Sequence, residues 1–77
     1  MITVYWRPGC PFCQRLRWRL RLRRVRAEWI NIYTDPDAAA FVRSVANGNE
    51  TVPTVVIDGE AFVNPAPRRV VAAGRGR

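Results

Sequence analysis

The cysteines of this chain are confined to one short stretch, Cys10-Pro11-Phe12-Cys13. A disulfide across so small a loop would restrain little of the unfolded chain, so the pair makes a poor structural staple. A structural zinc site needs four ligands, and two cysteines without any histidine supply only half of that set. Two incidental buried cysteines are the alternative, but the setting of the pair favours redox chemistry and argues against a metal centre.

The residues around the cysteines predict a strand followed by a helix. Residues 2–6 are β-branched and aromatic, and they end at the turn sequence Arg-Pro-Gly at 7–9. Residues 11–26 contain no interior glycine or proline, and Pro11 suits the first position of a helix. Apolar and basic residues alternate strictly over 15–22, which is the period of a strand. The flanking turns supply no hairpin partner for such a strand, so we expect a helix.

A second strand and a second helix are predicted next. Residues 27–33 read as a strand, and the crossover from the first strand is long enough for one helix, so the two strands should be parallel. Asp35 precedes a proline and is placed to cap a helix at its N-terminus. Phe41, Val42 and Val45 would form the buried side of that helix, which should stop at an Asn-Gly-Asn sequence.

The last third of the chain predicts a hairpin and a short helix. Residues 54–57 and 60–63 are extended runs on either side of an Asp-Gly pair, which is a strong signal for a two-residue hairpin turn. Residues 64–73 fit one short helix, and 74–77 should be a flexible tail. The resulting order is β-α-β-α-β-β-α within one domain of residues 1–77. Together with a Cys-x-x-Cys at the first strand-to-helix junction, it predicts an α/β, thioredoxin-like fold with a four-stranded mixed sheet and three helices.

This placement suits thiol chemistry. A thiol attacks a disulfide only as the thiolate, and the N-terminus of a helix stabilises an anion through free N–H groups and the helix dipole. Cys10 is so placed, and Arg7 and Arg15 add positive charge nearby. Cys13 lies one helical turn further on and could resolve a mixed disulfide formed at Cys10.

A second segment of interest is Thr51-Val52-Pro53, which precedes the third predicted strand. A proline that opens a strand cannot donate to the sheet, so it should lie at an edge or serve a special turn. Simple loop punctuation is an equally good reading of this proline from the residues alone.

These motifs and the order of elements resemble the glutaredoxin family over essentially the whole chain. The segments 41–45, 48–49, 51–55 and 64–65 are most similar to mycoredoxins, which are bacterial members that use mycothiol in place of glutathione. The resemblance implies that Cys10 is the nucleophile, that Cys13 resolves, and that the peptide bond before Pro53 is cis. It also implies a thiol-binding groove formed by a set of neighbouring residues: Arg7, Phe12, Thr51, Val52, Pro53 and Asn64. Arg7 could equally be a solvated loop charge, and Phe12 could equally be part of the core.

The nature of the bound thiol follows from one departure. Glutathione-binding members usually carry Gly-Gly-x-Asp after the fourth strand, and Phe62-Val63-Asn64-Pro65 stands in that place here. The γ-glutamyl carboxylate of glutathione therefore has no evident partner, and mycothiol is the expected co-substrate. No cofactor should be bound permanently, and the iron–sulfur clusters of single-cysteine relatives are not expected here.

The first helix is also unusually basic. The chain has a net charge of +7, and all of its 13 basic residues are arginines, seven of them within 15–26. Such a cluster suggests nucleic-acid binding, although no recognition motif accompanies it. It could instead attract an acidic protein partner or speed the encounter with anionic disulfides. Trp18 and Leu22 would lie on the face opposite Leu16 and Leu20, and we expect the last helix to cover them as core. If that helix is too short to cover them, they form an apolar patch rimmed by arginine, which indicates an interface.

The sequence thus predicts a monomeric, cytoplasmic thiol–disulfide oxidoreductase acting on protein disulfides or protein–mycothiol mixed disulfides. No apolar stretch approaches the ~20 residues of a membrane helix, so membrane association is not expected. One alternative is a thioredoxin-like electron donor, for example to ribonucleotide reductase, reduced directly by a flavoprotein. Such donors carry a characteristic C-terminal segment that residues 64–68 do not match. The other alternative is an arginine-rich module that binds nucleic acid or an acidic partner.

Overall fold

The structure, a computed structural model, describes residues 1–75 and contains seven helices and strands in the predicted order. Their bounds are β1 Ile2–Trp6, α1 Pro11–Leu22, β2 Glu28–Asn31, α2 Pro36–Val45, β3 Thr54–Ile57, β4 Glu60–Val63 and α3 Pro67–Arg75. The bounds of β1, β3 and β4 coincide with the prediction, and the Asp-Gly turn joins the last two strands.

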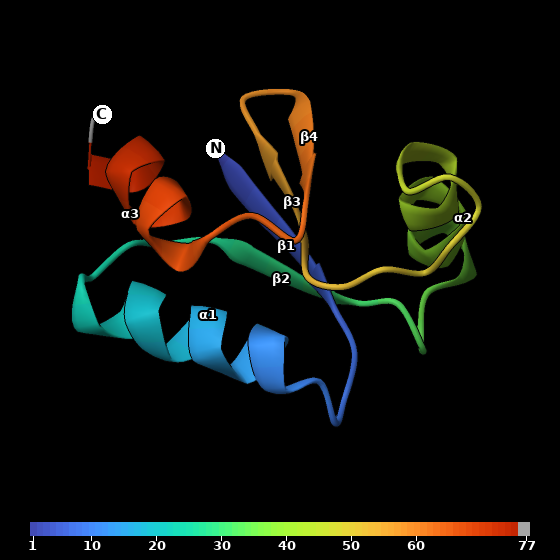
Figure 1. Ribbon diagram of the computed structural model, residues 1–77, viewed down its shortest axis with the longest axis horizontal. Helices are drawn as coiled ribbons and strands as arrows, with labels where there is room; N and C mark the ends of the chain where they lie inside the picture. The colour runs from blue at the N-terminus through green and yellow to red at the C-terminus, as the bar shows by residue number, and fades with distance from the viewer. Residues whose placement is uncertain (76–77) are drawn as a thin grey trace.

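The four strands form one mixed sheet in the order β2-β1-β3-β4 (Figure 1). β1 pairs in parallel with β2, as the crossover through α1 requires, and pairs antiparallel with β3. The β3–β4 hairpin completes the sheet. This is the thioredoxin-like fold of glutaredoxins that the sequence predicts.

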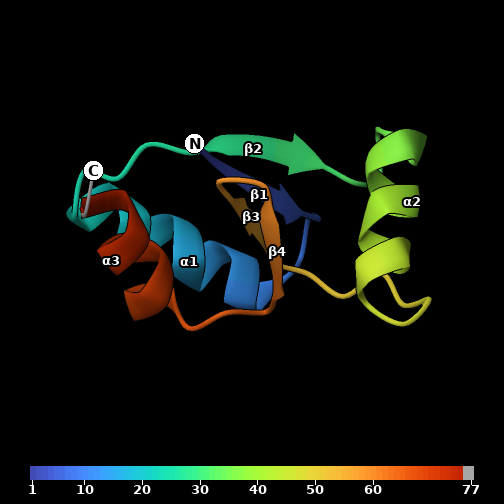
Figure 2. The same cartoon turned by 90° about the horizontal axis from the view of Figure 1, so that it is seen from above.

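Helices cover both sides of the sheet. α1 and α3 lie together on one side and α2 lies on the other (Figures 1 and 2). Under α1 and α3, one apolar cluster contains Ile2, Val4, Leu16, Leu20, Val55, Val70 and Val71. A second cluster joins buried residues of α2 to both cysteines and to Val52. The packing of α2 therefore supports the segment that holds the thiols.

α1 ends at Leu22, four residues before the predicted end. Arg24 takes φ 56° in the left-handed region, and the amide of Val25 donates to the carbonyl of Leu20 at 2.9 Å. The amide of Arg24 donates to the carbonyl of Arg21, which completes the usual hydrogen-bonding pattern of a helix C-terminus. Glycine is the usual residue at this position. Because arginine occupies it here, the sequence contained no signal that the helix ends at Leu22.

The expectation that Trp18 and Leu22 are core is wrong. Their side chains are 61% and 60% exposed, respectively. α3 packs through Val70 and Val71 onto the same apolar cluster as Leu20, so the outer face of α1 stays uncovered. Trp18 and Leu22 lie on that outer face.

The buried side of α2 also differs from the prediction. Val42 is fully buried, but Val45 is exposed and Phe41 is only partly buried. Ala38 and Ala39 fill the interface in their place, and small side chains let the helix lie close to the sheet.

The C-terminal helix runs into the predicted tail. α3 includes Gly74, whose position against the body of the protein leaves no room for a side chain. A Cβ atom at Gly74 would lie 2.5 Å from Cγ1 of Val25 and 3.4 Å from Cδ1 of Ile2. The last turn of α3 is therefore packed, and the remainder of the predicted tail, residues 76–77, lies outside the described residues. Within residues 1–75, no helix has the length and apolar character needed to cross a membrane.

The two faces of α1 can be compared by replacing one leucine on each. Leu20→Ala removes a side chain that is 1% exposed and should lower the free energy of unfolding by about 2–5 kcal/mol. Leu22→Ala removes the same group from an exposed site and should change it by less than about 0.5 kcal/mol. Urea denaturation of both variants measures the difference, and equal losses would contradict the assigned packing.

Candidate active site

Cys10 is held at the N-terminus of α1 by the turn that follows β1. Gly9 adopts φ 79°, a left-handed conformation that glycine takes without strain, and this turns the chain from the strand into the helix. Cys10 then occupies the N-cap position with extended backbone angles, and Pro11 is the first helical residue. Proline has no N–H group, and the first N–H of a helix has no partner within it, so no hydrogen bond is lost.

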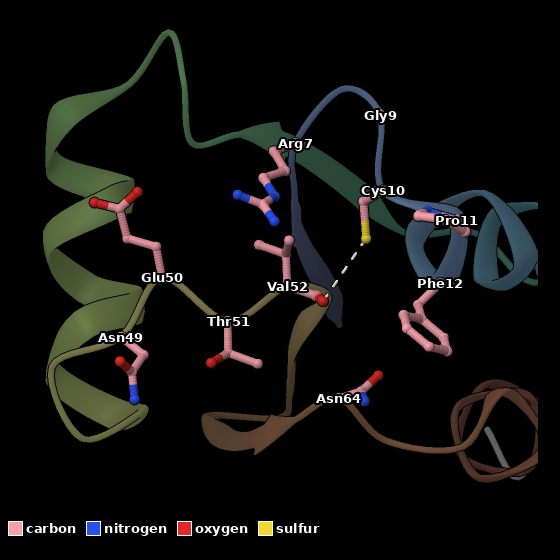
Figure 3. A pocket seen from close by; sticks show the side chains of 10 residues that line it. All are labelled: Arg7, Gly9, Cys10, Pro11, Phe12, Asn49, Glu50, Thr51, Val52 and Asn64. Atoms are coloured by element: carbon pink, nitrogen blue, oxygen red, sulfur yellow. Dashed lines mark hydrogen bonds between the residues drawn. The ribbon is translucent and has the colours of Figure 1, made fainter.

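The sulfur of Cys10 takes the place of a capping oxygen. The amide N–H of Cys13 donates to Sγ of Cys10 at 3.2 Å, and the Cys10 thiol donates to the carbonyl of Val52 at 3.7 Å (Figure 3). Cys10 and Cys13 are free thiols that are 6% and 3% exposed. The first turn of α1 contains no acidic residue, so no carboxylate competes for the N–H groups that would stabilise a thiolate.

The N-terminus of α2 is capped in the usual way, by a side-chain oxygen. In α2, a carboxylate oxygen of Asp35 accepts from the amide of Ala38 at 3.1 Å, and Asp37 adds a second negative charge in the first turn. Both helices thus offer the same N–H group to a capping side chain. In α1 that side chain is a sulfur, which can carry a negative charge and also attack a disulfide.

The loop from Thr51 to Pro53 faces the cysteines and is fixed at both ends. The Val52-Pro53 peptide bond is cis, as the family resemblance implies. The hydroxyl of the buried Thr54 donates to the carbonyl of Thr51 at 2.7 Å, and the amide of Asn64 donates to the carbonyl of Pro53 at 2.8 Å. These contacts leave the Val52 carbonyl directed at the Cys10 sulfur.

An open groove of about 600 Å³ lies over Cys10 and this loop (Figure 3). Most of the site residues predicted from the sequence line it: Arg7, Cys10, Phe12, Thr51, Val52 and Asn64. The other two do not, because Pro53 is fully buried and Cys13 faces a neighbouring hollow of about 270 Å³. Phe12 is mostly exposed, and therefore belongs to the groove and not to the core.

The groove also contains two residues that the sequence prediction missed. Asn49 and Glu50 line the groove on the side of α2. They directly precede Thr51 in the chain, and Asn49 also belongs to a segment that resembles mycoredoxins; for Glu50 the adjacency was the signal available. Their side chains add an amide and a carboxylate to the polar groups available to a ligand.

Charges of opposite sign meet in this groove. The side chain of Arg7 extends toward the space between Glu50 and Val52 (Figure 3). Glu50 is already paired with Arg43, with 2.6 Å between Oε2 and the arginine nitrogen. The negative charge of Glu50 is thus paired with Arg43, which does not line the groove. Arg7 remains as the cationic group of the groove.

The thiol of Cys13 is difficult to ionise. Burial, and to a smaller extent a hydrogen bond with Cys10, raise the pKa of Cys13 to about 12, since both effects favour the neutral thiol. A backbone hydrogen bond with Arg7 and the charge of that arginine act in the opposite direction but are weaker. Cys13 therefore holds its proton near neutral pH and is available as a hydrogen-bond donor to the sulfur of Cys10.

The hollow beside Cys13 is closed by a stacked arginine. The guanidinium of Arg17 lies 4.8 Å from the ring centre of Trp6 and 4.7 Å from that of Trp29. Both are cation–π distances, and the contacts hold α1 against β1 and β2 next to the cysteines. Among residues 1–75, no group of three or more potential metal ligands is positioned to hold an ion.

Together these features define a class of protein: a thioredoxin-fold chain with a dithiol at a helix N-terminus and an open groove beside it. A family model described as glutaredoxin matches residues 2–63. A Mycobacterium tuberculosis protein named as a candidate glutaredoxin is 39% identical over 72 residues, which cover 92% of this chain and 86% of that protein. The chain belongs to the glutaredoxin family and is an enzyme of the thiol–disulfide oxidoreductase type.

Three further likenesses refine the comparison. Mycoredoxin 1 of Corynebacterium glutamicum is 35% identical over 72 residues, covering 92% of this chain and 89% of the relative. The glutaredoxin-like NrdH-redoxin of Escherichia coli, which has a thioredoxin-like activity profile, superposes with a TM-score of 0.76 at 26% identity, covering 90% and 88% of the two chains. A thioredoxin-like protein solved by crystallography gives a TM-score of 0.80 at 27% identity, with 95% and 99% covered.

The difference between the thiols can be measured by alkylation of the reduced protein. We expect iodoacetamide near neutral pH to label Cys10 first, because Cys13, with a pKa of about 12, is almost entirely protonated there. Labelling of Cys13 should rise as the pH is raised toward that value, and peptide mass mapping separates the two sites. In Cys10→Ser the burial of Cys13 persists, so its labelling should remain slow. Equal labelling of both cysteines near neutral pH would contradict this assignment.

Proposed function

We propose that this protein reduces protein disulfides or protein–mycothiol mixed disulfides, with Cys10 as the nucleophile. The observation that carries the proposal is the position of the Cys10 sulfur. It accepts the N–H of Cys13 at the helix N-terminus and lines an open groove large enough for a small thiol. A thiolate at this place is stabilised by the helix and can be reached by a disulfide in the groove.

The proposed reaction begins with attack of the Cys10 thiolate on the mycothiol sulfur of a mixed disulfide. A new S–S bond forms between Cys10 and mycothiol, and the cysteine of the substrate protein leaves as a thiolate that takes up a proton. A second mycothiol thiolate then attacks the mycothiol sulfur, which restores Cys10 as a thiolate and releases oxidised mycothiol. The mycothiol removed from the substrate protein and one free mycothiol therefore leave together as oxidised mycothiol, and the free mycothiol is the net reductant.

Cys13 provides the other route out of the mixed disulfide. In the reduced protein its pKa is raised partly by the hydrogen bond and charge of Cys10. Both effects are lost once the Cys10 sulfur is bonded to the thiol, so Cys13 becomes easier to ionise at the step where its attack is useful. Attack of Cys13 on Cys10 would release mycothiol as a thiolate and close the Cys10–Cys13 disulfide, as needed for reducing protein disulfides.

The choice of mycothiol over glutathione rests on the charges of the groove. Glutathione carries two carboxylates, but Arg7 is the one cationic side chain among the residues that line the groove. Asn64 lies in the segment that replaces the Gly-Gly-x-Asp of glutathione-binding relatives. Mycothiol carries no carboxylate and therefore needs no second cationic partner. Arg7, Phe12, Thr51, Val52 and Asn64 would contact the thiol, with Pro53 shaping the loop from below.

The remaining expectations belong to the same proposal. Residues 1–77 would act as one domain and as a monomer, with no permanently bound cofactor and with oxidised proteins as substrates. Reduction by a low-molecular-weight thiol requires a compartment that keeps that thiol reduced, so we place the activity in the cytoplasm.

The choice of thiol can be tested with the Cys13→Ser variant, which should stop after the first attack. Incubated separately with oxidised mycothiol and with glutathione disulfide, it should gain the mass of one mycothiol rapidly and of one glutathione more slowly. Intact-protein mass spectrometry measures both rates. The matched Cys10→Ser variant, which keeps the buried thiol of Cys13, should gain neither. If both disulfides react no faster than with an unstructured cysteine peptide, the proposal fails.

The likeness to NrdH-redoxin favours a second candidate, in which a flavoprotein reductase reduces the Cys10–Cys13 disulfide directly. The two functions differ in their need for a small thiol. We expect NADPH and a thioredoxin reductase to reduce the oxidised wild-type protein only slowly, and added mycothiol to accelerate the reduction strongly. Rapid oxidation of NADPH without mycothiol, lost in Cys13→Ser, would instead establish the electron-donor function.

A further inference from the structure

The outer face of α1 carries an apolar row that nothing within residues 1–75 covers. Trp18 and Leu22 are one helical turn apart, so their side chains form a single ridge along the helix. Both are more than half exposed, and they lie opposite the buried Leu16 and Leu20. Contiguous exposed apolar side chains with a charged rim are typical of interaction surfaces.

Arginines flank this ridge on both sides. Arg15, Arg19 and Arg23 follow one another at intervals of four residues and form a row beside Trp18 and Leu22. Arg21 is exposed on the other side of the ridge. In the described part of the chain, no arginine of α1 is paired with a carboxylate, since the arginine ion pair recorded there is Arg43–Glu50. Like charges four residues apart destabilise a helix, so an acidic group next to this row would stabilise α1.

Two hollows next to the ridge are lined by arginine side chains. One, of about 420 Å³, is lined by Arg19, Leu22 and Arg23. Another, of about 250 Å³, lies between α1 and α3, where Arg19, Arg23 and Arg68 surround an apolar floor of Val71 and Ala72. Arginines from two helices thus line the second hollow, and two of them, Arg19 and Arg23, also line the first hollow with Leu22. Arginine binds carboxylates through two parallel hydrogen bonds, and this geometry allows it.

We propose that the outer face of α1 docks an acidic amphipathic helix of a partner protein. The apolar side of that helix would pack on Trp18 and Leu22, and its Asp or Glu residues would pair with Arg15, Arg19 and Arg23. The pattern is that of a paired helix surface, with an apolar seam and charged flanks that select an oppositely charged helix. Tryptophan and arginine are also the residues that most often dominate protein interfaces.

Two other occupants fit this face less well. A second copy of the chain would bring its own arginine row and a net charge of +7 against the same charges. A nucleic acid would satisfy the arginines, but the ridge would place Leu22 against a phosphate backbone or against bases with no apolar partner for it. An acidic helix satisfies both the arginines and the apolar ridge.

The test uses a synthetic helical peptide with leucines along one side and glutamates beside them. We expect its binding, followed by amide chemical-shift changes and Trp18 fluorescence, to move signals of α1 and to weaken as salt is added. Trp18→Ala and the double variant Arg19→Gln/Arg23→Gln should each weaken binding about tenfold or more. The same peptide with glutamines in place of glutamates should bind correspondingly weakly.

Matched variants separate this surface from general charge and from the active site. Tyr33→Ala removes a 63% exposed aromatic from another part of the surface, and Arg24→Gln/Arg26→Gln removes the same charge from the loop after α1. Neither should change peptide binding, and Trp18→Ala should leave the reduction of a small disulfide unchanged. The proposal is overturned if the peptide fails to bind or binds Trp18→Ala equally well. It is also overturned if single-stranded oligothymidylate binds more tightly than the peptide, independently of Trp18.

Discussion

The hydrogen bond from the Cys13 amide to the Cys10 sulfur is the interaction on which the site depends. It puts a sulfur where a helix normally has a carboxylate or a hydroxyl, so the fixed dipole of α1 acts on the reactive atom. Its position follows from Gly9, which turns the chain, and from Pro11, which starts the helix without a lost donor. Since the capping residue is also the nucleophile that we propose, one contact would serve both the start of the helix and the chemistry.

The sheet brings the second half of the site to this sulfur. β1 leads directly into Cys10, and β3 begins directly after the Thr51–Pro53 loop, so antiparallel pairing of the two strands places the loop opposite the cysteine. Thr54 and Asn64 then fix the loop by hydrogen bonds at both ends. The groove is therefore a consequence of strand order, and residues about 40 positions apart meet in it because β1 and β3 are neighbours.

The parts of this structure that sequence could predict are those with local causes. Alternating β-branched strands, the Asp-Gly hairpin and the cap at Asp35 depend on residues a few positions apart, and their predicted placement is confirmed. The position of Glu50 in the groove depends on where α2 ends relative to β1, which no local pattern contains. The end of α1 was missed for a related reason, since Arg24 takes a conformation usually reserved for glycine because Val25 packs into the core.

α1 is helical although its apolar and basic residues alternate with the period of a strand. In an alternating pattern, successive apolar residues are two positions apart and lie on opposite sides of a helix. Leu16 and Leu20 therefore point inward, while Trp18 and Leu22 point outward. The inner pair fixes the helix, and with it the orientation of Cys10, against the sheet. The outer pair is not needed for that purpose, because the core is complete without it. An alternating sequence on a helix that covers one side of a sheet thus leaves a second apolar row exposed. In this protein the row starts at Trp18, about two helical turns from Cys10.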